Sequence, residues 1–123
     1  MDKFKVMIVD DEQDILLTYS SMLHGEGYNI ETFSNPHEAL LHFIHADKSY
    51  YDLVILDIRM PNLNGLQLYH RLKVIDKDIK ILFLSALEAS EEITSMFPEL
   101  KQGDIIRKPI SKEYFVEKLS TLL

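Results

Sequence analysis

Residues 4–12 read FKVMIVDDE, an apolar run that ends in three consecutive acidic residues. A second apolar run, Leu53–Leu56, ends at a single acidic residue, Asp57. Runs of β-branched residues and leucine are typical of parallel strands that are buried on both faces, whereas aspartate is a poor strand residue. The two stretches therefore predict two buried strands, each with carboxylates at its carboxyl end.

The rest of the chain alternates short apolar runs with longer segments whose apolar residues recur at helical spacing. Asn35, followed by Pro36 and Glu38, predicts the N-cap and capping box of one helix, and Ser111 predicts the N-cap of another. The expected strands are 4–9, 28–33, 53–56, 81–84 and 105–106, and the expected helices are 14–23, 36–46, 65–75, 88–97 and 112–123. This order predicts an α/β fold of the (βα)5 type. Its doubly wound, five-stranded parallel sheet should have the flavodoxin-like strand order 2-1-3-4-5 and lie between two layers of helices.

Composition excludes several classes of protein. The 123 residues suffice for one domain, and the absence of cysteine excludes disulfides, thiolate zinc sites and a cysteine nucleophile. A formal net charge of −7 disfavours binding to DNA, RNA or an anionic membrane surface, and it favours a divalent cation or a basic partner. No apolar run is long enough for a signal peptide or a membrane span, so we expect a cytoplasmic protein.

Polar residues stand where this fold places ligand sites, beyond the carboxyl ends of strands at the reversal of strand order. Asp10 and Asp11 follow the first expected strand and Asp57 the third, while Ser85 and Lys108 follow the fourth and fifth. Three neighbouring carboxylates repel one another unless a cation such as Mg²⁺ (or Mn²⁺) lies between them. The ammonium and hydroxyl groups could neutralise phosphoryl oxygens while one carboxylate attacks phosphorus. This set of side chains therefore predicts that the protein transfers a phosphoryl group to one of its own aspartates.

Four motifs follow one another along the chain: MIVDDEQD (7–14), LVILDIRMPNLNGL (53–66), ILFLSA (81–86) and IIRKPI (105–110). At these spacings the chain resembles the receiver domain of two-component response regulators, the CheY-like superfamily, over essentially its whole length. The resemblance implies one response regulatory domain over residues 1–123, with no output domain in this chain. It also implies a phosphorelay signalling domain that catalyses its own phosphorylation and dephosphorylation, rather than an enzyme with a separate substrate.

The resemblance also implies roles for individual residues. Asp57 would be the phosphoacceptor, and its donor a histidine kinase, a histidine phosphotransfer protein or a small acyl phosphate. The side chains of Asp10, Asp11 and Asp57 and the backbone carbonyl of Arg59 would hold Mg²⁺. Lys108 would contact the phosphoryl group, and the peptide bond between Lys108 and Pro109 is expected to be cis.

Further positions would govern switching. Ser85 matches the switch hydroxyl, and the small Ala86 would leave room for the phosphoryl group. Arg59 and Leu87 occupy variable positions at the mouth of the site, where a long cation and an apolar side chain predict slow self-dephosphorylation. Ile105 stands where receivers usually carry an aromatic residue. Because isoleucine is stiff at its first torsion, we expect switching to rely on backbone movement after the fourth strand.

By the same resemblance, the helix 88–97, the fifth strand and the last helix would form the surface for a downstream protein or a homodimer. Direct nucleic-acid or membrane binding is not expected. The alternative is a receiver-like interaction module that acts without phosphorylation. An aspartate-nucleophile hydrolase is disfavoured because Arg59 stands where its second acid is expected. A flavin carrier is disfavoured because Asp10, Asp11 and Glu12 would repel its phosphate.

Two groups of ring side chains are assigned to the surface or to packing. His37, His42 and His45 cluster in the second expected helix, but their spacings do not put all three on one face. We therefore expect ordinary surface or partly buried histidines. Tyr50 and Tyr51 are expected to pack with their hydroxyls in water.

Overall fold

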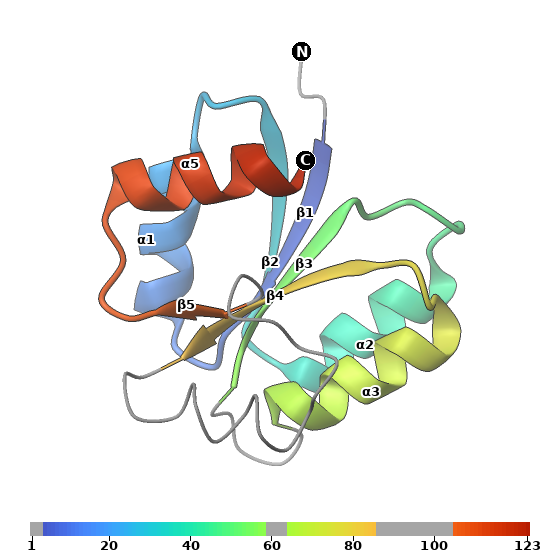
Figure 1. The fold of residues 1–123 in the computed structure, drawn as a ribbon. Coiled ribbons are helices and arrows are strands. Elements are labelled where there is room, and N and C mark those ends of the chain that lie inside the picture. The colour runs from blue at the N-terminus through green and yellow to red at the C-terminus, as the bar shows by residue number, and fades with distance from the viewer. Residues whose placement is uncertain (1–3, 59–63, 86–104) are drawn as a thin grey trace.

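The computed structural model describes residues 4–58, 64–85 and 105–123 and contains a five-stranded parallel sheet (Figure 1). The strand order is β2-β1-β3-β4-β5, and every neighbouring pair is parallel. The strands are β1 (Phe4–Val9), β2 (Tyr28–Phe33), β3 (Leu53–Asp57), β4 (Lys80–Ser85) and β5 (Ile105–Arg107). This arrangement confirms the predicted α/β fold and its flavodoxin-like strand order.

The helices form two layers, one on each face of the sheet. Figure 1 shows α1 beside α5 on one face and α2 beside α3 on the other. Their bounds are α1 (Gln13–Leu23), α2 (Pro36–His45), α3 (Gly65–Ile75) and α5 (Lys112–Leu122). The helix predicted for residues 88–97 lies outside the described residues. Among the helices that are described, none is long and apolar enough to cross a membrane.

Alternate side chains of the strands pack into two apolar clusters. Val6 and Ile8 of β1 lie in one cluster with Phe115 of α5, and Met7 and Val9 lie in the other, which includes residues of α2 and α3. All of β3 is buried, as expected for a central strand with helices on both faces. The two layers of packing hold the central strands so that their carboxyl ends meet at one end of the sheet.

Three strands extend one residue further at their carboxyl ends than the sequence pattern predicted, and β5 is one of them because it ends at Arg107. β3 ends at Asp57 and β4 ends at Ser85. The ladder continues because Asp57 lies opposite Leu84, and Ser85 lies opposite Arg107. The sheet itself therefore holds two polar residues of the predicted site, whereas a loop would leave them more freedom.

Side-chain caps mark the starts of α2 and α5. Asn35 Oδ1 accepts a hydrogen bond from His37 N–H at 2.8 Å, and Ser111 Oγ accepts one from Tyr114 N–H at 3.2 Å. Both N-caps were predicted. The second half of the capping box at α2 was not correct: in the described structure Asn35 N–H makes no bond to the Glu38 carboxylate. Glu38 is instead an exposed side chain on the surface of α2.

The two tyrosines before β3 differ from the prediction. Tyr51 is buried, and its hydroxyl donates to Glu31 Oε1 at 2.6 Å. Tyr50 remains 44% exposed, but its hydroxyl donates to Glu31 Oε2 at 3.1 Å. Lys5 Nζ lies 2.7 Å from the same oxygen. The tyrosine hydroxyls therefore bind a carboxylate of β2, where the sequence predicted contact with water.

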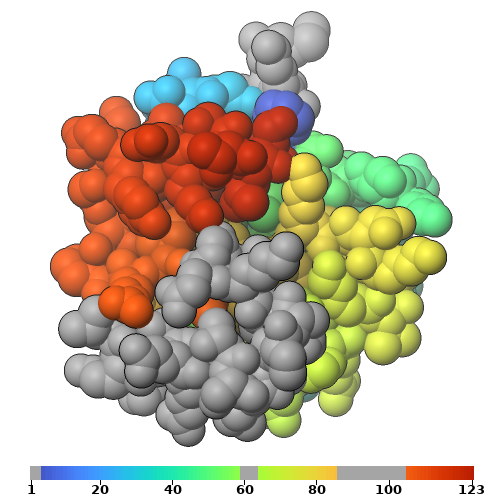
Figure 2. Space-filling view, in the orientation of Figure 1, coloured from blue at the N-terminus to red at the C-terminus, as the bar shows by residue number. Residues whose placement is uncertain are grey.

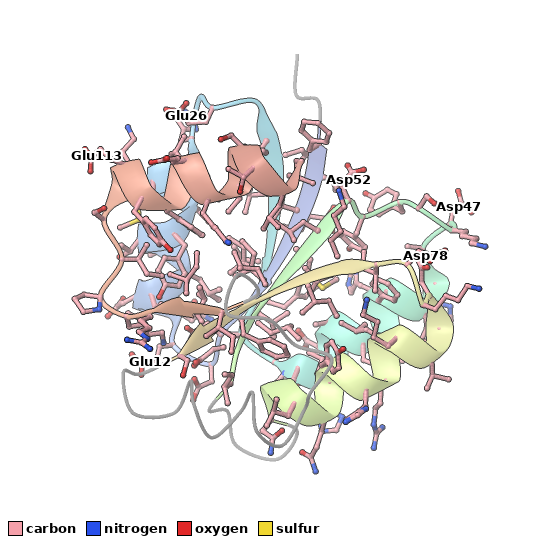
Figure 3. The ribbon with its side chains drawn as sticks, in the orientation of Figure 1. Glu12, Glu26, Asp47, Asp52, Asp78 and Glu113 are labelled. Atoms are coloured by element: carbon pink, nitrogen blue, oxygen red, sulfur yellow. The ribbon has the colours of Figure 1, made fainter. Side chains whose placement is uncertain are left out.

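Acidic side chains are spread around the molecule. Figure 3 shows them near the ends of α1 and α5, around the loops before β3 and β4, and at the carboxyl ends of the strands; those labelled are Glu26, Glu113, Asp47, Asp52, Asp78 and Glu12. In the space-filling view, β5 and α5 form one side of the visible face, and α3 and β4 form the other (Figure 2). Because the acids labelled in Figure 3 lie on several sides of the molecule, the net charge of −7 is not gathered on one face of the part that the structure describes.

Candidate functional site

The carboxyl ends of β1 and β3 bring three aspartates together. Val9 lies opposite Leu56 in the ladder, so Asp10 and Asp57 follow at neighbouring positions. Asp10, Asp11 and Asp57 each offer a carboxylate oxygen, and these oxygens lie within 4.8 Å of one another. The three predicted carboxylates thus form one cluster, at the point where the strand order reverses.

Lys108 extends from the end of β5 to this cluster. Its Nζ lies 3.3 Å from Asp57 Oδ1 and 3.7 Å from Asp10 Oδ2. Its backbone N–H donates to the carbonyl of Ser85 at 2.8 Å, which ties its backbone to the end of β4. The peptide bond between Lys108 and Pro109 is cis, the isomer that the resemblance implied. One ammonium group therefore contacts two of the three aspartates.

Asp10 is the most deeply buried acid of the cluster, with 1% of its surface exposed. Its Oδ1 accepts a hydrogen bond from Glu12 N–H at 3.0 Å, while its Oδ2 is buried without a hydrogen-bond partner in the described part of the chain. Burial raises the pKa of Asp10 to about 6, and the charges of Asp57 and Asp11 add to this rise. The Glu12 N–H bond and the Lys108 charge oppose it.

These observations fit a hard divalent cation. Three carboxylates lie close enough to share one ion, and a buried oxygen of Asp10 lacks a hydrogen-bond donor among the described residues. Carboxylate oxygens are the ligands that Mg²⁺ prefers. A cation between them would relieve both the mutual repulsion and the missing interaction of Asp10.

The start of α3 approaches the backbone of Asp57 closely. Gly65 N–H donates to the carbonyl of Ile58 at 3.0 Å. A Cβ on Gly65 would collide with the carbonyl oxygen of Asp57 and lie 2.9 Å from Ile58 Cα, so only glycine fits. Asn64 and Gln67 fix this helix start with a reciprocal capping box, with bonds of 2.9 and 3.0 Å. Sequence reasoning missed this support, although Asn64 and Gln67 have the spacing of a capping box.

The structure describes only some of the residues predicted to take part in switching. Ser85 is buried at the end of β4, and its carbonyl holds the backbone of Lys108. Ile105 is also buried, packs into an apolar cluster and lies opposite Phe83 in the ladder. Three other predicted positions lie outside the described residues: Arg59, Ala86 and Leu87.

A family match covers nearly the whole chain. The model of the response regulator receiver domain matches residues 6–120, a range that includes Asp10, Asp57, Ser85 and Lys108. The chain belongs to this family of receiver domains of two-component response regulators.

Curated relatives are about twice as long as this chain. The probable transcriptional regulator ycf27 of Pyropia yezoensis is 35% identical over 122 residues, which are 98% of this chain and 48% of that protein. The response regulator SaeR of Staphylococcus aureus is 32% identical over 118 residues, 96% of this chain and 50% of that protein. The chain thus spans about half the length of the curated relatives it matches.

Solved structures share the fold. A response regulator receiver domain protein from Clostridium thermocellum superposes with a TM-score of 0.85 at 25% identity, covering 98% of this chain and 94% of that one. CheY in the CheX–CheY–BeF3–Mg²⁺ complex from Borrelia burgdorferi also gives a TM-score of 0.85 at 25% identity, covering 98% of this chain and 90% of the other. Both agree with the family assignment.

Proposed function

We propose that this chain is a phosphorylation-dependent switch that accepts a phosphoryl group on Asp57. The donor is the phosphohistidine of a histidine kinase or histidine phosphotransfer protein, or a small acyl phosphate. A carboxylate oxygen of Asp57 forms a bond to phosphorus while the bond from phosphorus to the donor atom breaks, and the donor keeps that electron pair. The observation that carries the proposal is the Lys108 ammonium, 3.3 Å from Asp57 Oδ1 inside the aspartate cluster.

Lys108 supplies positive charge where negative charge gathers during transfer. It contacts Asp57 and Asp10, and 32% of its side chain is exposed, so it can reach an incoming phosphoryl oxygen as well. Ser85 lies at the neighbouring strand end and carries a neutral hydroxyl. We assign this hydroxyl to a phosphoryl oxygen after transfer, with the small Ala86 leaving space beside it.

Asp10, Asp11, Asp57 and the backbone carbonyl of Arg59 are the proposed ligands of Mg²⁺ (or Mn²⁺). Bound there, the ion neutralises charge on the carboxylates and on phosphoryl oxygens. The carboxylate cluster supports this assignment, as does Asp10 Oδ2, which is buried without a hydrogen bond in the described part of the chain. The Borrelia burgdorferi complex, which contains Mg²⁺ with CheY, supports the same ion.

Phosphorylation is proposed to change the surface that residues 88–97 are expected to form with β5 and α5, where a downstream protein or a second copy binds. The CheX–CheY complex of Borrelia burgdorferi supports a protein partner. Ile105 is buried against its neighbours and β-branched, so backbone movement carries the change in place of a rotating ring. Arg59 and Leu87 are proposed to slow the attack of water on the phosphoryl group.

Mass spectrometry of the intact protein, after incubation with acetyl phosphate and Mg²⁺, tests the proposal. Wild type should gain one phosphoryl group, Asp57→Asn should gain none, and EDTA should strongly reduce the reaction. Asp52→Asn is the matched control: Asp52 accepts a hydrogen bond from Lys5 N–H at 2.8 Å and lies at the amino end of β3, away from Glu12 and the carboxyl ends of the strands (Figure 3). It should be phosphorylated like wild type.

Two outcomes would overturn this function. A folded wild-type protein that gains no phosphoryl group, from acetyl phosphate or from a phosphorylated histidine phosphotransfer protein, would favour an interaction module that acts without phosphorylation. An equal adduct on Asp57→Asn would place the modification on another residue.

A further inference from the structure

A groove of about 1040 Å³ lies between α2 and the outer edge of the sheet, apart from the aspartate cluster. We call it the β2 edge groove. Its lining includes side chains from β2, from α2 and from the loop before β3, among them Glu31, Phe33, Glu38, Leu41, His42 and Asp47. Nothing in the proposed phosphoryl transfer uses these side chains.

One border of the groove is an edge strand. β2 pairs with β1 over its full length, and it is the terminal strand of the sheet. The carbonyl of Phe33 accepts the N–H of Asp10 at 3.1 Å, so the attachment to β1 continues to the strand end. The other side of β2 has no partner strand in the described sheet, so its backbone groups can pair with another extended chain.

The walls of the groove are apolar and held in place. The rings of Phe33 and His42 lie 4.7 Å apart, and those of Tyr50 and Tyr51 meet edge to face at 4.8 Å. Both tyrosine hydroxyls are bound to Glu31. Leu41 is 54% exposed, although it is a large apolar side chain. The groove thus offers a preformed apolar wall to a ligand.

The acidic side chains of the groove favour a positively charged ligand. Among the described lining residues are three carboxylates and no lysine or arginine. Lys5 compensates Glu31 at 2.7 Å, but no ion pair to Glu38 or Asp47 is present in the described structure. These two exposed acids therefore keep a net negative potential in the groove.

The spacing of the two acids matches an extended chain. Glu38 lies in the first turn of α2, and Asp47 lies just beyond its end (Figure 3). At the helical rise of 1.5 Å per residue, Glu38 and His45 are about 10 Å apart along the helix, and the extended Ala46 leads on to Asp47, so the two acids are roughly 13 Å apart. Residues i and i+4 of a β-strand are also about 13 Å apart and point to the same face.

We propose that the β2 edge groove binds an extended basic segment of a partner protein, which adds to β2 as a sixth strand. Lys or Arg side chains at i and i+4 of the segment face Glu38 and Asp47, and an apolar side chain at i+2 lies against Phe33 and His42. A second copy of this chain is a poor occupant, because a symmetric pairing of two β2 edges would bring like charges together, and each copy carries −7.

An NMR titration of the ¹⁵N-labelled, unphosphorylated protein tests this proposal. The probe is the acetylated and amidated heptapeptide Thr-Arg-Thr-Val-Thr-Arg-Thr. The control peptide, Thr-Arg-Thr-Val-Arg-Thr-Thr, has the same composition and charge but places its arginines on opposite faces. The first peptide should shift amide signals of β2 and α2 and bind about tenfold more tightly than the second.

A pair of protein variants tests the two acids. Glu38→Gln with Asp47→Asn should weaken binding of the first peptide about tenfold and reduce its salt dependence. The matched control, Glu26→Gln with Glu113→Gln, removes two exposed acids that lie near the ends of α1 and α5, and it should leave the affinity unchanged (Figure 3). Both double variants lose two negative charges and so have the same net charge. A general effect of protein charge would therefore weaken binding equally in both.

Several results would overturn the proposal. Equal affinity for the two peptides, or equal weakening in the two double variants, would show unspecific attraction to an acidic protein. Shifts of β2 and α2 signals that depend on protein concentration, without peptide, would identify a second copy as the occupant. Binding of agmatine as tight as that of the peptide would identify a site for small organic cations. Shifts confined to other elements would place the peptide elsewhere.

Discussion

Two carboxylates of the same strand pair, Asp10 just after β1 and Glu31 within β2, differ in their hydrogen bonds and in the direction of their pKa shifts. Asp10 at the end of β1 has an oxygen with no hydrogen-bond donor in the described structure, and burial raises its pKa to about 6. Burial also acts to raise the pKa of Glu31 in β2. Hydrogen bonds from Lys5, Tyr51 and Tyr50 outweigh this effect, so the pKa of Glu31 is lowered. The fold fully pairs Glu31 and leaves Asp10 partly unpaired.

The difference separates a structural role from a functional one. A carboxylate with three donors contributes to stability and has little capacity left for a ligand. A buried carboxylate beside two others costs stability, and that cost is recovered when a cation binds. Each of four experiments alters either the aspartate cluster or the hydrogen bonds of Glu31. They are given from the largest expected change in stability to the smallest.

The largest effect is expected where the backbone supports the aspartate cluster. Gly65→Ala should lower the free energy of unfolding by about 3 kcal/mol, because the new Cβ meets the backbone of Asp57 and Ile58, which cannot move aside cheaply. Urea denaturation measures this loss. Gly25→Ala is the control, since its Cβ would meet nothing within 4 Å and only its φ of +80° is unfavourable. It should cost about 1 kcal/mol. Equal losses of stability in the two variants would contradict the clash expected for a Cβ at position 65.

Asp10→Asn should stabilise the metal-free protein by about 2–3 kcal/mol at pH 7. Because the folded-state pKa is raised from 3.8 to about 6, the folded protein holds this proton more tightly than the unfolded chain does. The stability of wild type therefore falls as the pH rises from about 4 to about 6. Asn remains neutral, so the advantage of the variant should disappear near pH 4.

Urea denaturation at a series of pH values measures this difference. Asp78→Asn is the control, because Asp78 is an exposed aspartate far from the cluster (Figure 3). It should change stability by less than about 0.5 kcal/mol at every pH. An Asp10→Asn variant that is less stable than wild type at pH 7 would contradict the assigned cost of burial.

Mg²⁺ should act on the aspartate cluster alone. At ten times its dissociation constant, the ion should stabilise wild type by about 1.4 kcal/mol, measured as a rise in Tm. Asp10→Asn should show little of this rise, because the variant has lost one of the three carboxylates. Glu31→Gln should keep it. A rise of the same size in all three proteins would mean that the ion binds elsewhere.

The smallest effect is expected at the paired carboxylate. Tyr51→Phe should destabilise the protein by about 1 kcal/mol, because it removes one charged hydrogen bond to Glu31 and leaves the ring packing intact. The lowered pKa of Glu31 adds stability that is lost as the pH falls through it, and the variant should lose part of this dependence. Tyr50→Phe, with its longer bond and more exposed ring, should cost less.

The aspartate cluster could be predicted because it depends on strand order alone. Continuous apolar runs locate β1 and β3, and the favoured strand order 2-1-3-4-5 makes them neighbours. Asp10 and Asp57 then meet without any knowledge of side-chain rotamers. The sequence pattern ended β3 before Asp57, because aspartate is a poor strand residue and the pairing with Leu84 depends on the neighbouring strand.

The network around Glu31 could not be predicted in this way. Tyr51 and Glu31 are twenty residues apart in the chain and belong to different segments, so their contact depends on the path of the loop before β3. A tyrosine next to a strand is equally compatible with a hydroxyl in water. Glu38 has the same ambiguity, since an acid three residues after Asn35 can complete a capping box or point away. The rotamer decides, and local sequence does not encode it.

The bond from Asp10 N–H to the Phe33 carbonyl offers a built-in reporter. This amide belongs to the residue whose carboxylate ionises near pH 6, and its acceptor belongs to the edge strand. Its chemical shift should follow the charge of that carboxylate, and its hydrogen-exchange rate should follow the attachment of β2 to β1. One NMR cross-peak can therefore monitor both the acid cluster and the sheet edge, with no label beyond ¹⁵N.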